Sequence, residues 1–179
     1  DGDGVIALLA LHIGVDLVAV TTMTNLAFHA LMEEHGIRVV TTDVGDRYVL
    51  EALRREGGIL GGEQSGHVIC LDGHVTGDGL AAALLLCAAI GDTSLAEARK
   101  ILQPYPQVKQ NVAVRVRELP TAVAEEVARL NAELGAEGRI VVRPSGTEPV
   151  VRVLAEARDA GRAAELCATV GRLVEQQVG

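Results

Sequence analysis

Over residues 5–90, β-branched apolar runs alternate with segments of helical character, and few folds accommodate this rhythm. We read the runs at 17–22, 37–41 and 68–71 as buried strands, and we expect helices at 5–12, 26–35, 47–56 and 80–90. Strands that alternate with helices build sheets that are at least partly parallel and that carry the helices on their faces. We therefore predict an α/β fold with a mixed sheet for this part of the chain.

The segment Gln103-Pro104-Tyr105-Pro106 interrupts the rhythm, because its two prolines fix an extended connector. We place a domain boundary here, with one domain at 1–103 and a second at 104–179. Beyond the boundary, the sequence predicts strands at 110–116, 138–143 and 150–157 and helices at 121–134 and 160–177. The second domain is thus expected to be a small α+β domain, a sheet with two helices.

Composition limits the partners of the chain. Apolar residues make up 49% and aromatic residues only 2%, so the core must consist mainly of Val, Leu, Ile and Ala. The net charge of −8 argues against a nucleic-acid partner, which requires a basic face. Apart from Lys100 and Lys109, the basic residues are arginines, which bind oxyanions through two parallel bonds. A small anionic ligand held by a few arginines remains compatible with this composition.

The longest apolar run, Leu80–Ile90, is too short to cross a membrane, and no membrane partner is expected. Because it is apolar on nearly every face, we predict a buried helix. Cys70, Cys87 and Cys167 lie in apolar runs without CxxC spacing, so we expect small buried thiols and no disulfide framework or zinc site. Without a signal-peptide pattern in the opening run, we expect a cytoplasmic location.

The seven residues RPSGTEP, from Arg143 to Pro149, carry the clearest chemical signal. A turn of this composition can point backbone N–H groups into one concavity, where an anion binds. The hydroxyls of Ser and Thr and the guanidinium of Arg143 would add donors suited to a phosphate monoester. An ordinary hairpin turn is the alternative, but a charged residue directly after the apolar strand 140–142 would be unusual there.

The segment GGEQSGH, residues 61–67, is the second signal. It is not a nucleotide-binding P-loop, because no Lys-Ser/Thr pair and no helix follow its last glycine. Its carboxylate and hydroxyl suit the recognition of paired sugar hydroxyls. A glycine-rich turn with solvated polar groups is the alternative.

Two acidic segments admit simpler interpretations. In GDRY, residues 45–48, we expect Asp46 to cap the following helix, with Arg47 solvated. The opening DGDG resembles a magnesium loop, but Val5 stands where a third carboxylate would be needed. We therefore expect a turn that enters a helix.

The segments VGDRYV, GGEQSGH and RPSGTEP resemble the C-terminal half of the bacterial phosphoglucosamine mutase family, within the α-D-phosphohexomutase superfamily. The likeness extends along nearly the whole chain and includes TGDG at 76–79 and PYPQV at 104–108. It implies that the two domains correspond to the body of the third family domain and to the fourth. It also implies interconversion of glucosamine 6-phosphate and glucosamine 1-phosphate in the cytoplasm, through a phosphoserine enzyme, a bisphosphate intermediate and Mg²⁺.

The resemblance also assigns roles to individual residues. Glu63 and Ser65 match ligands of the sugar hydroxyls, and Arg47 matches a cation facing the sugar loop. His67 matches a histidine near the reacting phosphate that can act as acid or base. Ligands of the non-transferred phosphate match four residues of one loop, namely Arg143, Ser145, Gly146 and Thr147.

Neither the family's phosphoserine loop nor its D-G-D-x-D-R metal loop occurs in this sequence. We therefore expect no metal ligands here, no activity of the chain alone, and N-terminal domains of the same polypeptide as partners. A homodimer is left open by the sequence. Two other functions stay open as well, a phosphomannomutase/phosphoglucomutase and a non-catalytic module that binds a sugar phosphate.

Overall fold

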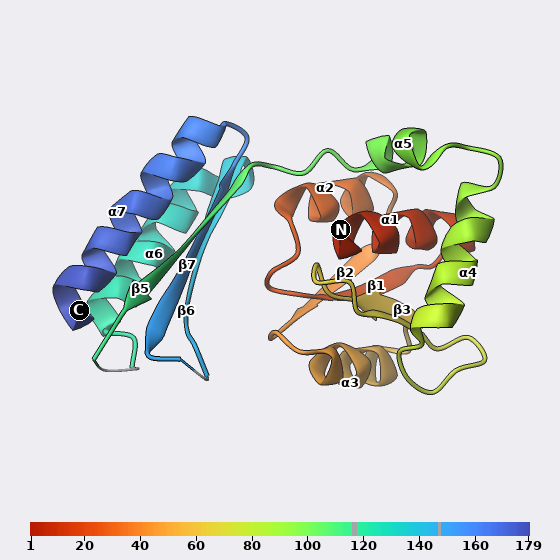
Figure 1. Cartoon of the computed structure of the whole chain (residues 1–179), viewed down its shortest axis with the longest axis horizontal. Helices are drawn as coiled ribbons and strands as arrows, with labels where there is room; N and C mark the ends of the chain where they lie inside the picture. Colours follow the sequence, from red (N-terminus) through yellow and green to blue (C-terminus); the bar gives the residue numbers. More distant parts are fainter. Residues whose placement is uncertain (116–117, 147) are drawn as a thin grey trace. The chain divides into compact units, whose positions relative to one another are not determined.

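In the computed structural model, which describes residues 1–115, 118–146 and 148–179, the chain packs into two compact units (Figure 1). The first unit is Asp1–Pro104 and the second is Tyr105–Gly179. The first is a mixed-sheet α/β unit and the second a small α+β unit, which confirms the predicted fold class.

The first unit interleaves strands and helices in the predicted order. Its elements are α1 (Gly2–Ile13), β1 (Leu17–Thr21), α2 (Leu26–Glu34), β2 (Arg38–Thr42), α3 (Asp46–Glu56), β3 (Leu60–Gly62), β4 (Val68–Cys70), α4 (Gly79–Ile90), α5 (Leu95–Ala98) and η1 (Arg99–Ile101). The strand order is β2-β1-β3-β4, in which β1 pairs with β2 and β3 in parallel and β4 runs antiparallel to β3. Three consecutive carboxyl ends therefore lie along one edge of this sheet.

Helices cover both faces of this sheet, with α1 and α2 on one side and α3 on the other (Figure 1). The strands are short, and β1 is buried along its whole length because both of its faces are covered. The only Phe of the chain, Phe28, is fully buried together with Met32 and Leu53. The aromatic-poor sequence thus builds a core that is almost entirely aliphatic.

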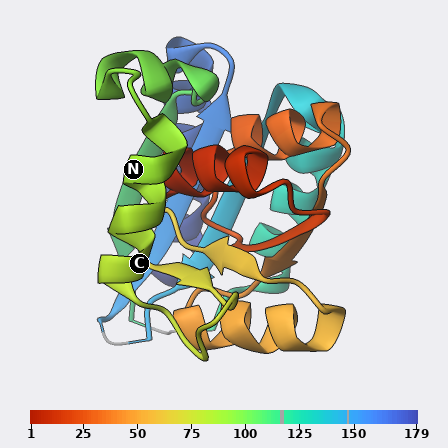
Figure 2. The ribbon, with the colours of Figure 1, turned by 90° about the vertical axis from the view of Figure 1, so that its right-hand side faces the viewer.

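Helix α4 contradicts the prediction that it is buried. It contains no buried residue, and the side chains of Leu80 and Leu84 are 72% and 65% exposed. The reason is its place in the unit, since α4 lies against α1 at the side of the fold and not between layers (Figure 2). Cys87 on this helix is exposed as well, whereas Cys70 and Cys167 are buried as expected, and all three thiols are free.

The second unit is a three-stranded antiparallel sheet with two long helices on one face (Figure 1). Its elements are β5 (Gln107–Ala113), α6 (Thr121–Leu134), η2 (Gly135–Glu137), β6 (Gly138–Pro144), β7 (Val150–Ala157) and α7 (Ala160–Val178). Strand β7 lies in the centre, between β5 and β6. Its residues Val151, Val153 and Ala155 join the core beneath the helices, so the residues between them belong to the opposite face.

Several element boundaries differ from the predictions. Strand β5 begins three residues before the predicted 110 and ends at Ala113, and residue 116, the last of the predicted strand, is outside the described residues. Helix α1 begins at Gly2, earlier than predicted, because the carboxylate of Asp1 accepts a hydrogen bond from the Gly4 N–H and caps the helix. Asn25, Asp78 and Ser94 cap their helices through side-chain oxygens.

No single helix within the described ranges is both long and apolar enough to span a membrane. The pair formed by α4 and the segment Leu95–Ile101 meets the length and composition requirements jointly, with a 90° bend between the two.

Candidate functional site

Loops 22–25, 43–45 and 63–67 emerge at the carboxyl edge of the first sheet, because the strands β1, β2 and β3 that precede them run parallel. The chain reverses its direction of winding at β1, with β2 on one side and β3 on the other. In open α/β sheets, ligands bind outside the carboxyl ends of the strands at such a switch point. The loops after β1 and β3 therefore flank the natural binding position of this unit.

Glu63 connects two of these loops. Its Oε1 accepts a hydrogen bond from the Gly45 N–H at 2.7 Å, and its Oε2 accepts one from the Ser65 hydroxyl at 3.3 Å. The Nδ1 atom of His67 lies 3.6 Å from the same Oε2, which makes an ion pair when the imidazole is protonated. Glu63 thus fixes loop 43–45 to loop 63–67 and brings three predicted site residues together.

These bonds leave room for the predicted role of Glu63 in sugar binding. An ionised carboxylate offers about four lone-pair positions, and the protein donors use two or three of them. Glu63 can accept further bonds from hydroxyls while it holds the loop. The roles of Glu63, Ser65 and His67 toward a sugar phosphate stay predictions.

Asp46 does not cap α3, which corrects the prediction. Gly45 takes the N-cap position, with its N–H bound to Glu63, and this puts Asp46 inside the first turn of the helix. The Asp46 carboxylate accepts a bond from the Arg47 N–H at 2.8 Å, and an acidic group is favourable at this end of a helix. The exposed guanidinium of Arg47 lies 4.5 Å from the ring centre of Tyr48. Its contact with a sugar stays a prediction.

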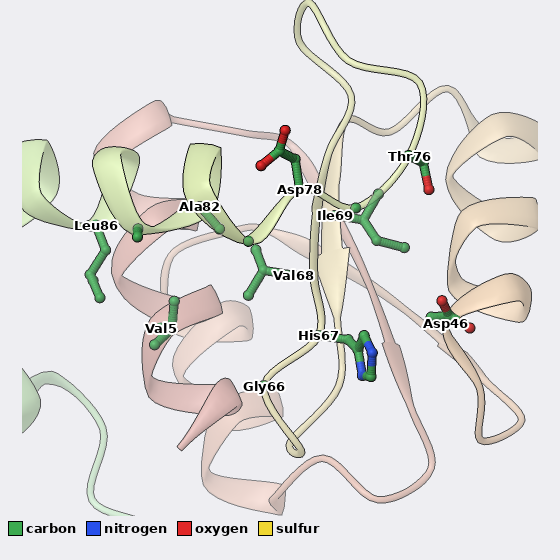
Figure 3. A pocket seen from close by; sticks show the side chains of 13 residues that line it. Val5, Asp46, Gly66, His67, Val68, Ile69, Thr76, Asp78, Ala82 and Leu86 are labelled. Atoms are coloured by element: carbon green, nitrogen blue, oxygen red, sulfur yellow. The ribbon is translucent and has the colours of Figure 1, made fainter.

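A cavity of about 350 Å³ opens beside these loops, between β4, α1 and the start of α4 (Figure 3). Its polar lining includes His67 from the end of loop 63–67 and Asp46 from the start of α3. The side chains of Thr76 and Asp78 line it near α4, and Val5 and Val68 add apolar surface. A volume of this size is near the lower limit for small-ligand sites. Of the residues predicted to act on substrate, His67 reaches this cavity.

In the second unit, the β6–β7 hairpin places Arg143 directly opposite Arg152. Like charges in directly opposite positions destabilise a sheet. The Nε atoms of both arginines are buried and have no hydrogen-bond partner among the described residues. Buried donors of this kind are costly unless they meet an acceptor. Two guanidinium groups at opposite positions of a hairpin, each with an Nε donor unpartnered in the described part of the chain, are an arrangement that a phosphate dianion can satisfy.

The loop between the two arginines is organised by its own hydrogen bonds. The Ser145 N–H donates to the Val150 carbonyl at 2.9 Å, and the Ser145 hydroxyl accepts from the Glu148 N–H at 3.3 Å. Two of the backbone donors expected to form an anion nest are therefore engaged within the loop. The nearly buried Ser145 hydroxyl, 3% exposed as a residue, also lies 3.5 Å from Nη2 of Arg152. Gly146 belongs to the same loop, and Thr147 is outside the described residues.

Arg152 was missed by the sequence reasoning, although the signal was present. A second arginine stands in the strand that follows the RPSGTEP turn, and the register of the hairpin, which pairs Pro144 with Val151, places it opposite Arg143. Arg152 also forms an ion pair with Glu148 at 2.8 Å. An anion that enters between the arginines would compete with this carboxylate.

The described residues contain no cluster of three or more His, Cys, Asp or Glu side chains that could hold a metal ion. The hydrogen bonds of the opening DGDG explain why this segment does not act as a magnesium loop. The Asp1 carboxylate caps α1, and the Asp3 carboxylate accepts bonds from the Asn25 N–H and the Gln64 side chain. The part of the chain that the structure describes thus does not fit the metal that the family resemblance implies.

Comparison with known protein families assigns the class. The model for phosphoglucomutase/phosphomannomutase, alpha/beta/alpha domain III, matches residues 1–105, and the model for the C-terminal domain of the same family matches residues 94–172. The chain belongs to the phosphoglucomutase/phosphomannomutase family, the phosphohexomutases.

Within this family, the chain is similar to bacterial phosphoglucosamine mutases. It is 46% identical to that of Saccharopolyspora erythraea over 97% of the chain and 42% of the relative, and 46% identical to that of Streptomyces griseus over 100% and 42%. The chain thus spans about two fifths of the length of these curated relatives.

Solved structures show the same fold. N-acetylphosphoglucosamine mutase of Aspergillus fumigatus matches with a TM-score of 0.86 and 21% identity, over 98% of this chain and 43% of that one. A structure of the same fungal protein with GlcNAc-6P and magnesium matches with a TM-score of 0.79 and 20% identity, over 98% and 44%.

Proposed function

We propose that this chain is the sugar- and phosphate-binding part of a phosphoglucosamine mutase, which interconverts glucosamine 6-phosphate and glucosamine 1-phosphate. The observation that carries the proposal is the pair Arg143 and Arg152, two opposed cations whose buried Nε donors lack acceptors among the described residues. The similarity to bacterial phosphoglucosamine mutases supports the choice of sugar.

In this proposal, the hairpin loop of the second unit binds the phosphate that is not transferred. Arg143 and Arg152 donate to its oxygens, and the Ser145 hydroxyl, already within reach of Arg152, donates to a third oxygen. Gly146 and Thr147, which also match phosphate ligands of the family, bind the same phosphate in this proposal. Charge neutralisation of this kind is the main contribution that a protein makes to phosphoryl transfer.

The first unit binds the sugar in this proposal. Glu63 and Ser65 accept and donate hydrogen bonds to the hydroxyls, while the contact from Glu63 to Gly45 keeps the loop in place. Arg47 contributes positive charge from the neighbouring loop. His67, whose ring is mostly exposed and close to the Glu63 carboxylate, moves a proton at the reacting hydroxyl.

The phosphoserine and the magnesium ion of the reaction belong, in this proposal, to the part of the relatives that the chain does not match. Magnesium supplies charge neutralisation when it is bound, and the described residues hold no site for it. This chain binds and orients the substrate.

We further propose the N-terminal domains of such an enzyme as the physical partner of this chain, within one cytoplasmic polypeptide. The outward face of α4 suits this contact, because Leu80, Leu84 and the neighbouring Leu95 are exposed apolar side chains. Exposed apolar surface of this kind marks sites of association. Alternatively, the same face forms a homodimer. Sedimentation of the chain alone measures whether it dimerises.

The proposal is tested by titrating glucosamine 1-phosphate into the 179-residue chain and following amide shifts by NMR. Arg143→Lys keeps the charge but loses the two-pronged geometry, so we expect affinity to fall by about 5- to 150-fold, or roughly 1–3 kcal/mol. Arg172→Lys is the matched control, since Arg172 is an exposed arginine of α7, and its affinity should equal that of the unaltered chain. Melting temperatures should be the same for all three proteins.

The same titration with glucose 1-phosphate, mannose 1-phosphate and inorganic phosphate separates the alternatives. Preference for the glucosamine esters supports the proposal, and preference for another hexose phosphate assigns the chain to a different mutase. Unchanged affinity of Arg143→Lys would contradict the phosphate role of this arginine.

A further inference from the structure

The opening segment Asp1-Gly2-Asp3-Gly4 has no role in the proposed function, yet its first helical turn packs against the loop that bears Glu63. The Gly2 N–H donates to the Gln64 carbonyl at 3.0 Å. A Cβ atom on Gly2 would collide with the backbone oxygen of Glu63 and would come within 2.9 Å of the Gly66 nitrogen. Only glycine permits this close approach.

Asp3 joins the two loops that flank the switch point of the sheet. Its side chain is fully buried, although carboxylates are rarely buried unless they are bonded. Its Oδ2 accepts a hydrogen bond from the Asn25 N–H at 2.9 Å, in the loop after β1, and another from Nε2 of Gln64 at 3.3 Å, in the loop after β3. One buried carboxylate thus bonds to both loops.

The connection continues to Glu63. Gln64 follows Glu63 directly, and the Glu63 carbonyl accepts from the Gly66 N–H at 2.9 Å, which closes the turn. A shift of this turn would move the Glu63 carboxylate away from the Gly45 N–H, with which it forms a 2.7 Å bond. The path from Asp3 to the loop edge therefore consists of consecutive contacts within one unit.

We propose that Asp3 and Gly2 are positioning residues for the sugar-binding loop 63–67, acting through Gln64 to hold the carboxylate of Glu63 in place. An inference about positioning toward a sugar rests on the proposed function. The mechanical part of the inference stands on its own, because it concerns contacts within this chain.

Amide hydrogen exchange in the 179-residue chain tests the mechanical part. Gly2→Ala and Asp3→Asn should speed exchange of the Gly45 amide, the reporter of the Glu63 bond, by about tenfold or more. Exchange in β1, for example at Val18, should stay unchanged. If Gly2 and Asp3 served only global stability, exchange at Val18 would become faster as well. The segment supplies matched controls. Asp1→Asn keeps a good capping residue, and Gly4→Ala adds a Cβ whose nearest neighbour is Asp1 Oδ1 at 3.7 Å. Neither control should affect Gly45.

A reversed hydrogen bond provides a rescue. With Asp3→Asn and Gln64→Glu together, the amide at position 3 can donate to a carboxylate at position 64, and the slow exchange of Gly45 should return. Equal loss of protection at Gly45 and Val18, or no loss at either, would overturn the inference.

Titration with glucosamine 1-phosphate then tests the functional part. Affinity should fall by about tenfold in Gly2→Ala and Asp3→Asn and stay unchanged in both controls. If the unaltered chain binds no sugar phosphate, the proposed function fails while the exchange result still decides the positioning role. Unchanged affinity despite faster Gly45 exchange would overturn the link to the sugar.

Discussion

Arg143 and Glu63, to which we assign ligand contacts, are held by the structure in two different ways. Arg143 has a buried Nε with no acceptor among the described residues, so this donor is available for a ligand. Glu63 is held by the Gly45 N–H and the Ser65 hydroxyl, so its orientation is set before a ligand arrives. An orientation fixed in advance lowers the entropic cost of binding.

The charge of Glu63 can be removed without removing its anchoring bond. Glu63→Gln keeps an oxygen that can accept from Gly45 but loses the charge and one acceptor. Charge-assisted hydrogen bonds contribute about 1.5–3 kcal/mol, so we expect about tenfold weaker binding of glucosamine 1-phosphate. The melting temperature should hardly change. Calorimetric titration of both proteins measures this, and equal affinities would make loop 63–67 an ordinary turn.

At the scale of elements, α4 is an apolar helix that is nevertheless exposed. Leu84 is 65% exposed, so Leu84→Glu should change the free energy of unfolding by less than about 0.5 kcal/mol. Leu9→Ala in the fully buried part of α1 should instead cost about 2–5 kcal/mol. Urea unfolding measures both. A large loss for Leu84→Glu would mean that the outward face of α4 is covered.

We expect the stability of the first turn of α4 to depend on pH. The N–H groups of Ala81 and Leu80 bond to the Asp78 carboxylate and, with a smaller contribution from His74, lower its pKa below the usual value of 3.8. Because the pKa is lowered in the folded state, the cap contributes its full stability above the ordinary pKa of the carboxyl. This contribution is lost as the pH falls through the lowered pKa of the folded state. We expect the amide shifts of Leu80 and Ala81 to titrate below pH 3.8, and Asp78→Asn, which caps without titrating, to abolish the transition. A midpoint above 3.8 would contradict this cap.

At the scale of the molecule, the chain consists of two units with their own core clusters, one between the first sheet and α3 and one beneath α6 and α7. Each unit carries one of the proposed binding loops. Neither contains the phosphoserine loop implied by the family resemblance, and the described residues hold no metal cluster. We therefore expect the purified chain to bind glucosamine phosphates but to show no mutase turnover. A coupled assay detects turnover, and activity without a contaminating full-length enzyme would contradict the expectation.

Local sequence patterns were sufficient for much of this protein. The alternation of apolar runs with helices defines the mixed sheet, and the prolines at 104 and 106 lie at the junction of the two units. Capping by Asn25 and Asp78 was also predictable, because a cap is a contact between residues two or three positions apart. The motif GGEQSGH identified residues that the structure brings together, since they share one turn.

Contacts between distant segments decided the rest. Composition alone could not show that α4 lies at the side of the unit, because burial depends on what packs against a helix. The same holds for Asp46, displaced from the cap by a Gly45 bond to Glu63, and for Arg152, which pairs with Arg143 only through the register of the hairpin. The sequence predicted only that Asp3 lies in a turn that enters a helix. In the structure its carboxylate accepts hydrogen bonds from residues 22 and 61 positions away. Such partners are chosen by the packing of the whole unit, because a buried charge must find its hydrogen bonds wherever the fold provides them.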